Sequence, residues 1–339
     1  MTPEDLLASA RVFALPLHRE FRGVTVREGL LFEGPSGWGE FAPFLDHSDA
    51  HAARWLAAAV EQAFGTWPEK RRERIPVNAI IPETDATTTR ALVAAAVADG
   101  CTTVKTKVGG RDLEADVERV AAIHEGIAAV GGRIRIDANA RWTLAEAVER
   151  LPVLDAAAGG LEYVEQPVAD PGELRELHRR VSVPIAVDEG IRLAVDPVAE
   201  LRGVREVADV VVLKAIPLGG VRPALAIAEA IDAAGDRALP IIVSGSLDTS
   251  VGLASGLWLA AALPELGGAC GLGTGALLRH DVVAHPQAIV DGQLRVARTA
   301  PEDVDPAGLV DDAMRARWQS RLRRAWEHAR MDRLGEAFA

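Results

Sequence analysis

Charged residues close a succession of short apolar segments in the middle of the chain. A lone lysine at the end of a strand usually reaches into solvent, and a lone acid usually caps the following helix. Here the pattern recurs over five successive segments, which favours a shared chemical role over five separate structural ones. In chain order the residues are Lys105, Lys107, Asp137, Asn139, Glu165, Asp188 and Lys214.

The three acids of this set predict a metal site. Asp137, Glu165 and Asp188 end consecutive segments, and neighbouring strands lie about 4.8 Å apart. Carboxylates that close need a cation to keep them ionised. Oxygen ligands suit Mg²⁺, with Mn²⁺ as a substitute, far better than zinc. Asp188 is preferred over its neighbour Glu189 because it faces the same way as the interior residues of its segment.

Lysines flank the predicted metal site on both sides. Lys105 and Lys107 are two residues apart and so share one face of a strand, and Lys214 follows a more distant strand. Removing a proton α to a carboxylate builds an enediolate, whose charge a metal ion and an ammonium group stabilise. A lysine whose pKa is lowered by the metal and a second lysine is a suitable base. The set therefore predicts proton abstraction next to a carboxylate.

The segments that carry these residues form a regular repeat. Eight β-branched runs begin 24 to 31 residues apart, and an amphipathic stretch follows each of the first seven. One such stretch starts at Thr143 with Glu146 three residues on, the spacing of a capping box. Eight such units predict a closed barrel, which places its chemistry at the C-terminal ends of the strands. The runs are 77–81, 103–108, 133–138, 161–165, 185–188, 209–214, 240–244 and 269–273.

The two ends of the chain lie outside this repeat. Strands are expected within 12–32, a helix over 49–64, a hairpin with a turn at Asp291–Gly292 over 288–297, and a charged helix over 313–339. We expect the two ends to pack together beside the barrel mouth. The predicted division is an α+β capping domain over 1–75, a barrel over 76–284 and a segment over 285–339 that completes the cap.

Composition and charge exclude several classes of protein. The chain has 339 residues, 49% of them hydrophobic and 25% charged, as in soluble globular proteins. It has no apolar run of about 18 residues and no signal-peptide layout, so we expect no membrane partner. A net charge of −12 disfavours nucleic acid. Cys101 and Cys270 are expected to be buried, reduced thiols of a cytoplasmic protein. The oligomeric state is left open.

Taken together in order, the motifs resemble those of the enolase superfamily, in its muconate-cycloisomerase-like subgroup. They are GWGEFAP, KTK, DANARW, EQP, DE, LK and PLGG, and they extend over nearly the whole chain. The resemblance implies an α/β fold: a (β/α)7β TIM-like barrel with an α+β capping domain, completed by the C-terminus.

Within that subgroup, three segments are similar to the o-succinylbenzoate synthase family: IRIDANARWT, VSGSLDTSVG and CGLGTGALL. That resemblance implies a Mg-dependent syn dehydration of 2-succinyl-6-hydroxy-2,4-cyclohexadiene-1-carboxylate to o-succinylbenzoate, in menaquinone biosynthesis. It also implies that Lys107 abstracts the α-proton and then helps the hydroxyl leave from the same face. Lys214 would stabilise the enediolate, and Lys105 would support the base.

Contacts to a dicarboxylate substrate are expected around the metal site. SGS and GLGTG expose backbone N–H groups at the starts of the following helices, a common place for an anion. Phe21 and Arg22 are included because they fall where a cap loop would cover the substrate. The predicted substrate-binding residues are Asn139, Arg135, Ser244, Gly245, Ser246, Gly271, Phe21 and Arg22.

Alternative functions remain beside the synthase. The segment 271–278 has no acid, which disfavours dipeptide epimerases and muconate cycloisomerases. An N-acylamino-acid racemase fits the same lysines, with Lys107 and Lys214 exchanging roles as acid and base, alone or as a second activity. A non-catalytic ligand-binding barrel is a remote alternative, since it would not need lysines on both flanks of three acids.

Overall fold

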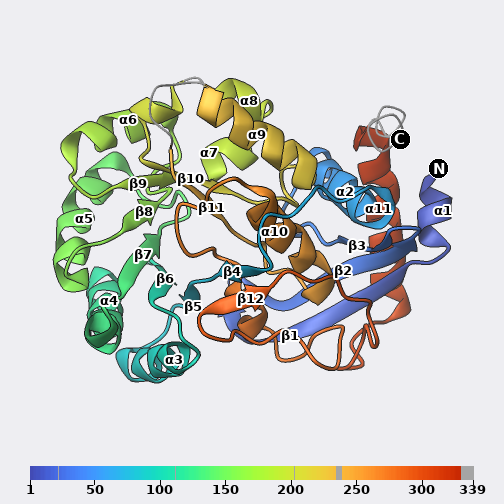
Figure 1. Ribbon diagram of the computed structural model, residues 1–339, viewed down its shortest axis with the longest axis horizontal. Coiled ribbons are helices and arrows are strands. Elements are labelled where there is room, and N and C mark those ends of the chain that lie inside the picture. The colour runs from blue at the N-terminus through green and yellow to red at the C-terminus, as the bar shows by residue number, and fades with distance from the viewer. Residues whose placement is uncertain (22, 111, 202, 234–238, 330–339) are drawn as a thin grey trace.

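Parallel strands in chain order form the central sheet of the computed structural model, which describes residues 1–21, 23–110, 112–201, 203–233 and 239–329. Each strand pairs with the next one along the chain, and the sheet curls around a common axis (Figure 1). The strands are β5 (Ala79–Ile81), β6 (Thr103–Lys107), β7 (Arg133–Asp137), β8 (Tyr163–Glu165), β9 (Ile185–Val187), β10 (Val210–Leu213) and β11 (Ile241–Val243).

The eighth predicted run closes this sheet. Parallel bridges join Ser244 to Gly271 and Val77 to Cys270. The N–H of Gly271 donates to the carbonyl of Val243 at 2.8 Å, and the N–H of Cys270 donates to Pro76 at 2.7 Å. Residues 270 and 271 therefore lie between β11 and the start of β5. The predicted barrel is confirmed.

Helices connect the strands and cover the outside of the barrel (Figure 1). Their caps follow from the sequence: Asp85 caps α3, and Thr143 with Glu146 forms a capping box at the start of α5. The elements are α3 (Ala86–Ala98), α4 (Leu113–Ile127), η1 (Ala128–Val130), α5 (Leu144–Ala158), α6 (Pro171–Arg180), α7 (Glu189–Arg192), α8 (Pro197–Glu200), η2 (Val204–Glu206), α9 (Val221–Ala233), α10 (Ser250–Ala262) and η3 (Gly273–Leu277).

A separate layer of strands and helices, built from both ends of the chain, forms the cap. Its strands are antiparallel, and α11 packs against α2 from the far end of the sequence. This layer has a hydrophobic core of its own, which includes Phe13, Trp55 and Trp318. The elements are α1 (Pro3–Leu7), β1 (Arg11–Phe21), β2 (Val24–Gly34), β3 (Gly37–Phe41), α2 (Asp49–Phe64) and α11 (Asp312–Ala329). The rest of the predicted tail helix, 330–339, lies outside the described residues.

The expected hairpin over 288–297 takes a different form. Asp291 and Gly292 do make a tight turn with positive φ angles of 53° and 69°, closed by a bridge between Val290 and Gln293. The following strand β12 (Gln293–Arg295) then pairs with β4 (Arg74–Pro76). Leu294 joins the hydrophobic core of the barrel, so burial of this side chain draws the strand to the barrel and away from the cap.

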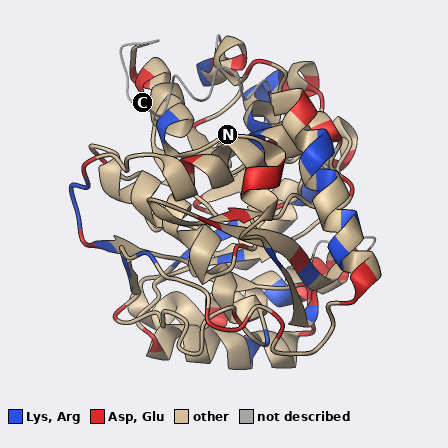
Figure 2. Cartoon of the chain, turned by 90° about the vertical axis from the view of Figure 1, so that its right-hand side faces the viewer, with Lys and Arg blue, Asp and Glu red and all other residues tan. Residues whose placement is uncertain are grey.

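The described surface mixes charges of both signs. Lysine and arginine positions alternate with aspartate and glutamate positions over the helices visible in Figure 2. Both cysteines, Cys101 and Cys270, are buried and free, as expected.

Within the described part of the chain, no helix combines the length and apolar character needed to cross a membrane.

Candidate active site

The register of the barrel strands brings the predicted site residues together. In the parallel pairing of β6 with β7, Lys107 lies opposite Asp137, and in the pairing of β7 with β8, Asp137 lies opposite Glu165. Residues in register point to the same side of a sheet, so the lysine and both acids converge at the C-terminal end of the barrel. Lys105, two residues before Lys107, lies on the same face.

These side chains form a buried network of ion pairs. The Nζ of Lys105 lies 2.5 Å from Glu165 Oε2 and 2.9 Å from Asp137 Oδ2. The Nζ of Lys107 donates to Asp137 Oδ2 and to Asn139 Oδ1, both at 2.6 Å. Asn139 has a positive φ of 47°, and its N–H donates to Asp137 Oδ1 at 3.0 Å. The backbone thus turns back on the acid and places the amide beside Lys107.

The third predicted acid joins the network from the next strand. Lys214 Nζ lies 2.6 Å from Asp188 Oδ2, and Arg192 Nε lies 3.0 Å from Asp188 Oδ1. Glu189 is half-buried close by, with Oε1 accepting from Arg192 at 2.7 Å and from Asn139 Nδ2 at 3.0 Å. Both acids of the DE pair therefore face the site, Asp188 against the lysine and Glu189 against Asn139.

Burial and neighbouring charge set the protonation of the two lysines on β6. Burial lowers the pKa of Lys107, and the positive charges of Lys105 and Lys214 lower it further, against the opposing effect of Asp137. Burial also acts to lower the pKa of Lys105, but the charges of Asp137 and Glu165 outweigh it and hold that pKa well above its usual range. Of the pair, Lys107 is therefore the better proton acceptor.

The pKa values of the three carboxylates are also shifted in different directions. Burial and the charge of Asp137 raise the pKa of Glu165 to about 7. Burial has the same tendency at Asp137, yet Lys105 and Lys107 hold that pKa well below its usual range. At Asp188, Arg192 and Lys214 likewise overcome the effect of burial and lower the pKa.

This donor set fits a divalent cation. Among the described residues, no three acidic, histidine or cysteine side chains converge on one point; the Nζ of Lys105 contacts Asp137 and Glu165, and that of Lys214 contacts Asp188. Glu165 Oε1 and Glu189 Oε2 are buried and have no hydrogen-bond partner. Buried carboxylate oxygens left without a donor are costly, and a hard cation with oxygen ligands relieves that cost.

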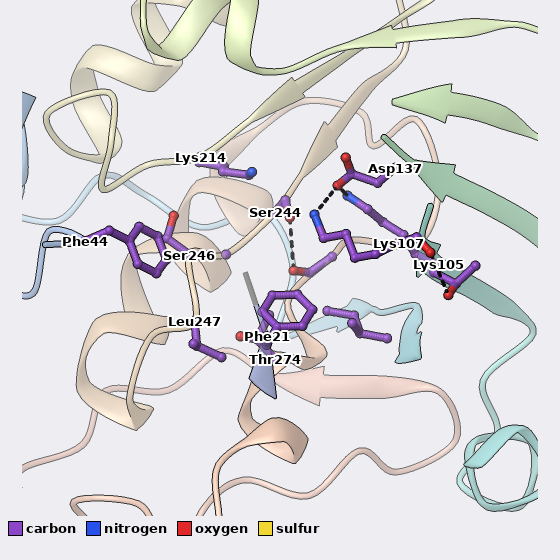
Figure 3. A pocket seen from close by; sticks show the side chains of 14 residues that line it. Phe21, Phe44, Lys105, Lys107, Asp137, Lys214, Ser244, Ser246, Leu247 and Thr274 are labelled. Carbon is purple, nitrogen blue, oxygen red and sulfur yellow. Dashed lines mark hydrogen bonds and ion pairs between the residues drawn. The ribbon is translucent and has the colours of Figure 1, made fainter. Parts of the chain in front are cut away.

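A cavity opens directly above this network. Figure 3 shows Lys105 and Lys107 entering from one side with Asp137, and Lys214 reaching in from another. Phe21 closes the cavity from the cap, with Lys107 Nζ 5.6 Å from its ring centre. The lining residues are Phe21, Phe44, Ile80, Lys105, Thr106, Lys107, Asp137, Lys214, Ser244, Gly245, Ser246, Leu247, Gly271 and Thr274.

Most of the expected substrate contacts lie at this cavity. Phe21, Ser244, Gly245, Ser246 and Gly271 all line it. Asn139 is not among the lining residues, and its Oδ1 accepts from the Nζ of Lys107. Arg22 falls outside the described residues.

Arg135 lies apart from the residues that line this cavity. It is fully buried inside the barrel, where its Nε donates to Glu162 at 2.6 Å and its Nη1 to the carbonyl of Ala269 at 2.5 Å. Its guanidinium also lies 4.9 Å from the ring centre of Tyr163. Arg135 was predicted to share a face with Asp137, and it lies one layer deeper, where its Nε and Nη1 are hydrogen-bonded and its Nη2 is buried without a partner.

Several residues of the site carried no signal that we used. Phe44 and Thr274 line the cavity, and Glu189 with Arg192 supports Asn139 and Asp188. Gln166 of the EQP motif also contributes, since its Oε1 accepts from the N–H groups of Asp188 and Gly190, both at 3.1 Å. A signal was present for three of them, because Phe44 lies beside GEFAP, Thr274 inside GLGTG and Gln166 inside EQP.

Comparison with known families agrees with this geometry. A family described as "Enolase C-terminal domain-like" matches residues 88–301, and one described as "Enolase N-terminal domain-like" matches residues 12–63. The chain therefore belongs to the enolase superfamily.

Curated relatives make the resemblance more specific. The o-succinylbenzoate synthase of Mycobacterium tuberculosis (strain H37Rv) is 47% identical over 93% of this chain and 92% of its own length. The o-succinylbenzoate synthase of Thermobifida fusca is 46% identical over 94% and 97%.

Solved structures show the same fold at low identity. The L-Ala-D/L-Glu epimerase of Bacillus subtilis superposes with a TM-score of 0.72 at 22% identity, over 86% of this chain and 96% of its own. The muconate lactonizing enzyme of Pseudomonas putida gives 0.71 at 21%, over 91% and 98%.

Proposed function

We propose that this chain is an o-succinylbenzoate synthase, a hydro-lyase of the enolase superfamily. It removes water from 2-succinyl-6-hydroxy-2,4-cyclohexadiene-1-carboxylate to give o-succinylbenzoate for menaquinone biosynthesis. The observation that carries the proposal is one cavity lined by Lys107, Lys214 and Asp137, in a chain 46–48% identical to curated synthases. The pathway and the two reduced, buried cysteines fit a cytoplasmic enzyme.

Asp137, Glu165 and Asp188 would hold Mg²⁺, or Mn²⁺ in its place. When bound, the ion supplies positive charge that binds the ring carboxylate and stabilises the enediolate. The lysines supply the other charges that the reaction needs. Lys214 adds a fixed ammonium group on the far side of the cavity, and Lys105 remains protonated and disfavours a second charge on Lys107.

The reaction needs one proton acceptor that later acts as a donor. Neutral Lys107 takes the proton from C1, and the electron pair of the C–H bond enters the carboxylate to give the enediolate. The pair then returns to form the C1–C6 double bond as the C6–O bond breaks. Lys107 gives its proton to the departing hydroxyl, which leaves as water, and the ring becomes aromatic. Asn139 positions the Nζ of Lys107 throughout.

N-acylamino-acid racemase activity is the second candidate. Lys107 and Lys214 both line the cavity, and two lysines on opposite faces of an α-carbon can exchange its proton. Dehydration is favoured because the close relatives carry the synthase name.

The test is turnover of the cyclohexadiene substrate by purified protein with Mg²⁺, followed by loss of diene absorbance. We expect turnover that a chelator abolishes and Mg²⁺ restores, and a loss of about 10³-fold or more in Lys107→Ala. Folded protein that binds Mn²⁺ but leaves the diene unchanged would refute the synthase. Exchange of α-deuterium in N-acylated amino acids would then identify the racemase.

A further inference from the structure

The wall of the cavity that follows β11 is held in an unfavourable backbone conformation. Residues 244–247 line the cavity, and the N–H of Ser246 donates to Asp248 Oδ2 at 2.9 Å. Leu247 has a φ of 63°, in the left-handed region that residues with a side chain rarely adopt. A leucine keeps such a conformation only where its surroundings hold it there.

The cap supplies one of the contacts that hold it. Arg27, on β2, is 2% exposed, and its Nε donates to the carbonyl of Leu247 at 2.9 Å. The same guanidinium donates to the carbonyl of Ala42 and stacks 4.7 Å from the ring centre of Phe44, another residue of the cavity. One cap arginine therefore fixes two neighbouring parts of the cavity wall.

Glu40 of the GWGEFAP motif supplies a second contact. It is 1% exposed and lies at the start of α10, where it accepts from Thr249 Oγ1 at 2.6 Å and from the backbone N–H groups of Thr249 and Gly252 at 3.1 Å and 2.9 Å. A side-chain oxygen at a helix N-terminus accepts from backbone N–H groups that have no partner within the helix. A Cβ at Gly252 would lie 2.5 Å from Glu40 Oε2, so the glycine is what allows this close approach.

We propose that Arg27 and Glu40 are positioning residues through which the cap shapes the wall 244–249 and thereby sets the affinity for substrate. Neither touches the reacting atoms. Arg27 holds the carbonyl of Leu247, and Glu40 holds Thr249 at the end of the same segment. The inference rests on the proposed function for its substrate, and it extends that function by making substrate affinity depend on contact between cap and barrel.

The chain provides a matched control for this idea. Glu61, on α2, is also buried and also crosses from cap to barrel, where it accepts from the N–H groups of Val221 and Arg222 at the start of α9. Residues 221 and 222 are not among those that line the cavity. Glu61→Gln therefore makes the same side-chain change at the same interface without disturbing the wall.

The experiment compares Glu40→Gln, Arg27→Met and Glu61→Gln in steady-state kinetics and in hydrogen exchange of the segment 244–249. We expect KM to rise about tenfold in the first two variants, corresponding to about 1.4 kcal/mol, with kcat within about twofold of wild type. We also expect exchange in 244–249 to become faster in those two variants. Glu61→Gln should leave both KM and this exchange unchanged. Gly252→Ala gives a further test, because its methyl group displaces the carboxylate of Glu40.

Wild-type KM and wild-type exchange in Glu40→Gln and Arg27→Met would overturn the inference, and so would an equal rise of KM in Glu61→Gln. A wild-type enzyme that does not turn over the diene would refute the proposed function instead. Hydrogen exchange would still decide whether the cap positions the wall, because it requires no substrate.

Discussion

Replacing Arg135 by methionine should destabilise the protein while leaving substrate affinity unchanged. Arg135 is fully buried and is bonded to Glu162, to the carbonyl of Ala269 and, at 3.1 Å, to Asn78 Oδ1. Methionine fills much of the same volume but leaves these three acceptors without their donor. The carboxylate of Glu162 is the costly one, because it loses its buried partner and keeps the exposed Arg133.

The size of the effect follows from the exposure of that carboxylate. Breaking a buried ion pair costs about 3 to 5 kcal/mol. The Glu162 side chain retains 16% of its exposure, so solvent screens part of the cost. We therefore expect a loss near the lower end, about 3 kcal/mol in the free energy of unfolding.

Arg133 is the matched control, because it contacts the same carboxylate from the same strand. Its Nη1 lies 3.1 Å from Glu162 Oε1, but its side chain is 68% exposed. Exposed ion pairs contribute about 0 to 1 kcal/mol, so Arg133→Met should change stability by no more than that.

Equilibrium urea unfolding of both variants measures the effect, with KM for the diene measured alongside. A stable Arg135→Met enzyme with a raised KM would refute this reasoning, because it would make Arg135 a substrate contact.

Three further predictions concern the acids and the second lysine. Glu165→Gln should weaken Mn²⁺ binding by about tenfold or more, measured by calorimetry, because a neutral amide replaces a carboxylate whose Oε1 has no other partner; unchanged affinity would exclude Glu165 as a ligand. Lys214→Met should lower kcat by about 10² to 10³-fold with Mn²⁺ affinity retained, since the developing enediolate loses its ammonium while Asp188 keeps Arg192 as a partner; a wild-type kcat would contradict that role. Burial and the charge of Asp248 raise the pKa of Glu40 to about 8, so the folded protein keeps a proton that the unfolded chain loses from about pH 4.5 upward. Stability should therefore fall as pH rises from 5 to 8, by at most about 1.4 kcal/mol per pH unit from this group. Urea unfolding at several pH values should show a smaller change of stability with pH in Glu40→Gln. Equal changes in the variant and the wild type would show that Glu40 is not the group responsible.

The repeat of strands and the position of the acids were predictable because each rests on local pattern. β-branched runs at a regular spacing predict strands, and parallel strands bring residues such as Lys107 and Asp137 into register at one edge. The capping box at Thr143 was predictable for the same reason, since its two residues are three apart in the chain.

Contacts between segments that are distant in the chain were harder to predict from the sequence. Arg135 and Asp137 share a face, and alternation alone does not say which layer of the barrel receives substrate and which is filled by side chains. The pairing of β12 with β4 could not be predicted from local pattern, because β4 lies far earlier in the chain. Arg27 and Leu247 likewise meet only through the docking of cap on barrel, and the left-handed backbone at Leu247 has no local sequence signature.

The pairing of early with late segments of the chain has a consequence for how the protein folds during synthesis. The barrel closes through the pairing of Val77 with Cys270, so its last seam cannot form on the ribosome until both residues have emerged. Helix α11 follows later still, and its Arg321 donates to the carbonyl of Phe44, a residue of the cavity, at 2.7 Å. In a nascent chain that lacks α11, the cap core is missing Trp318, and Phe44 is missing this contact. Assembly of the substrate cavity is therefore a late step of synthesis, completed only after α11 has emerged from the ribosome.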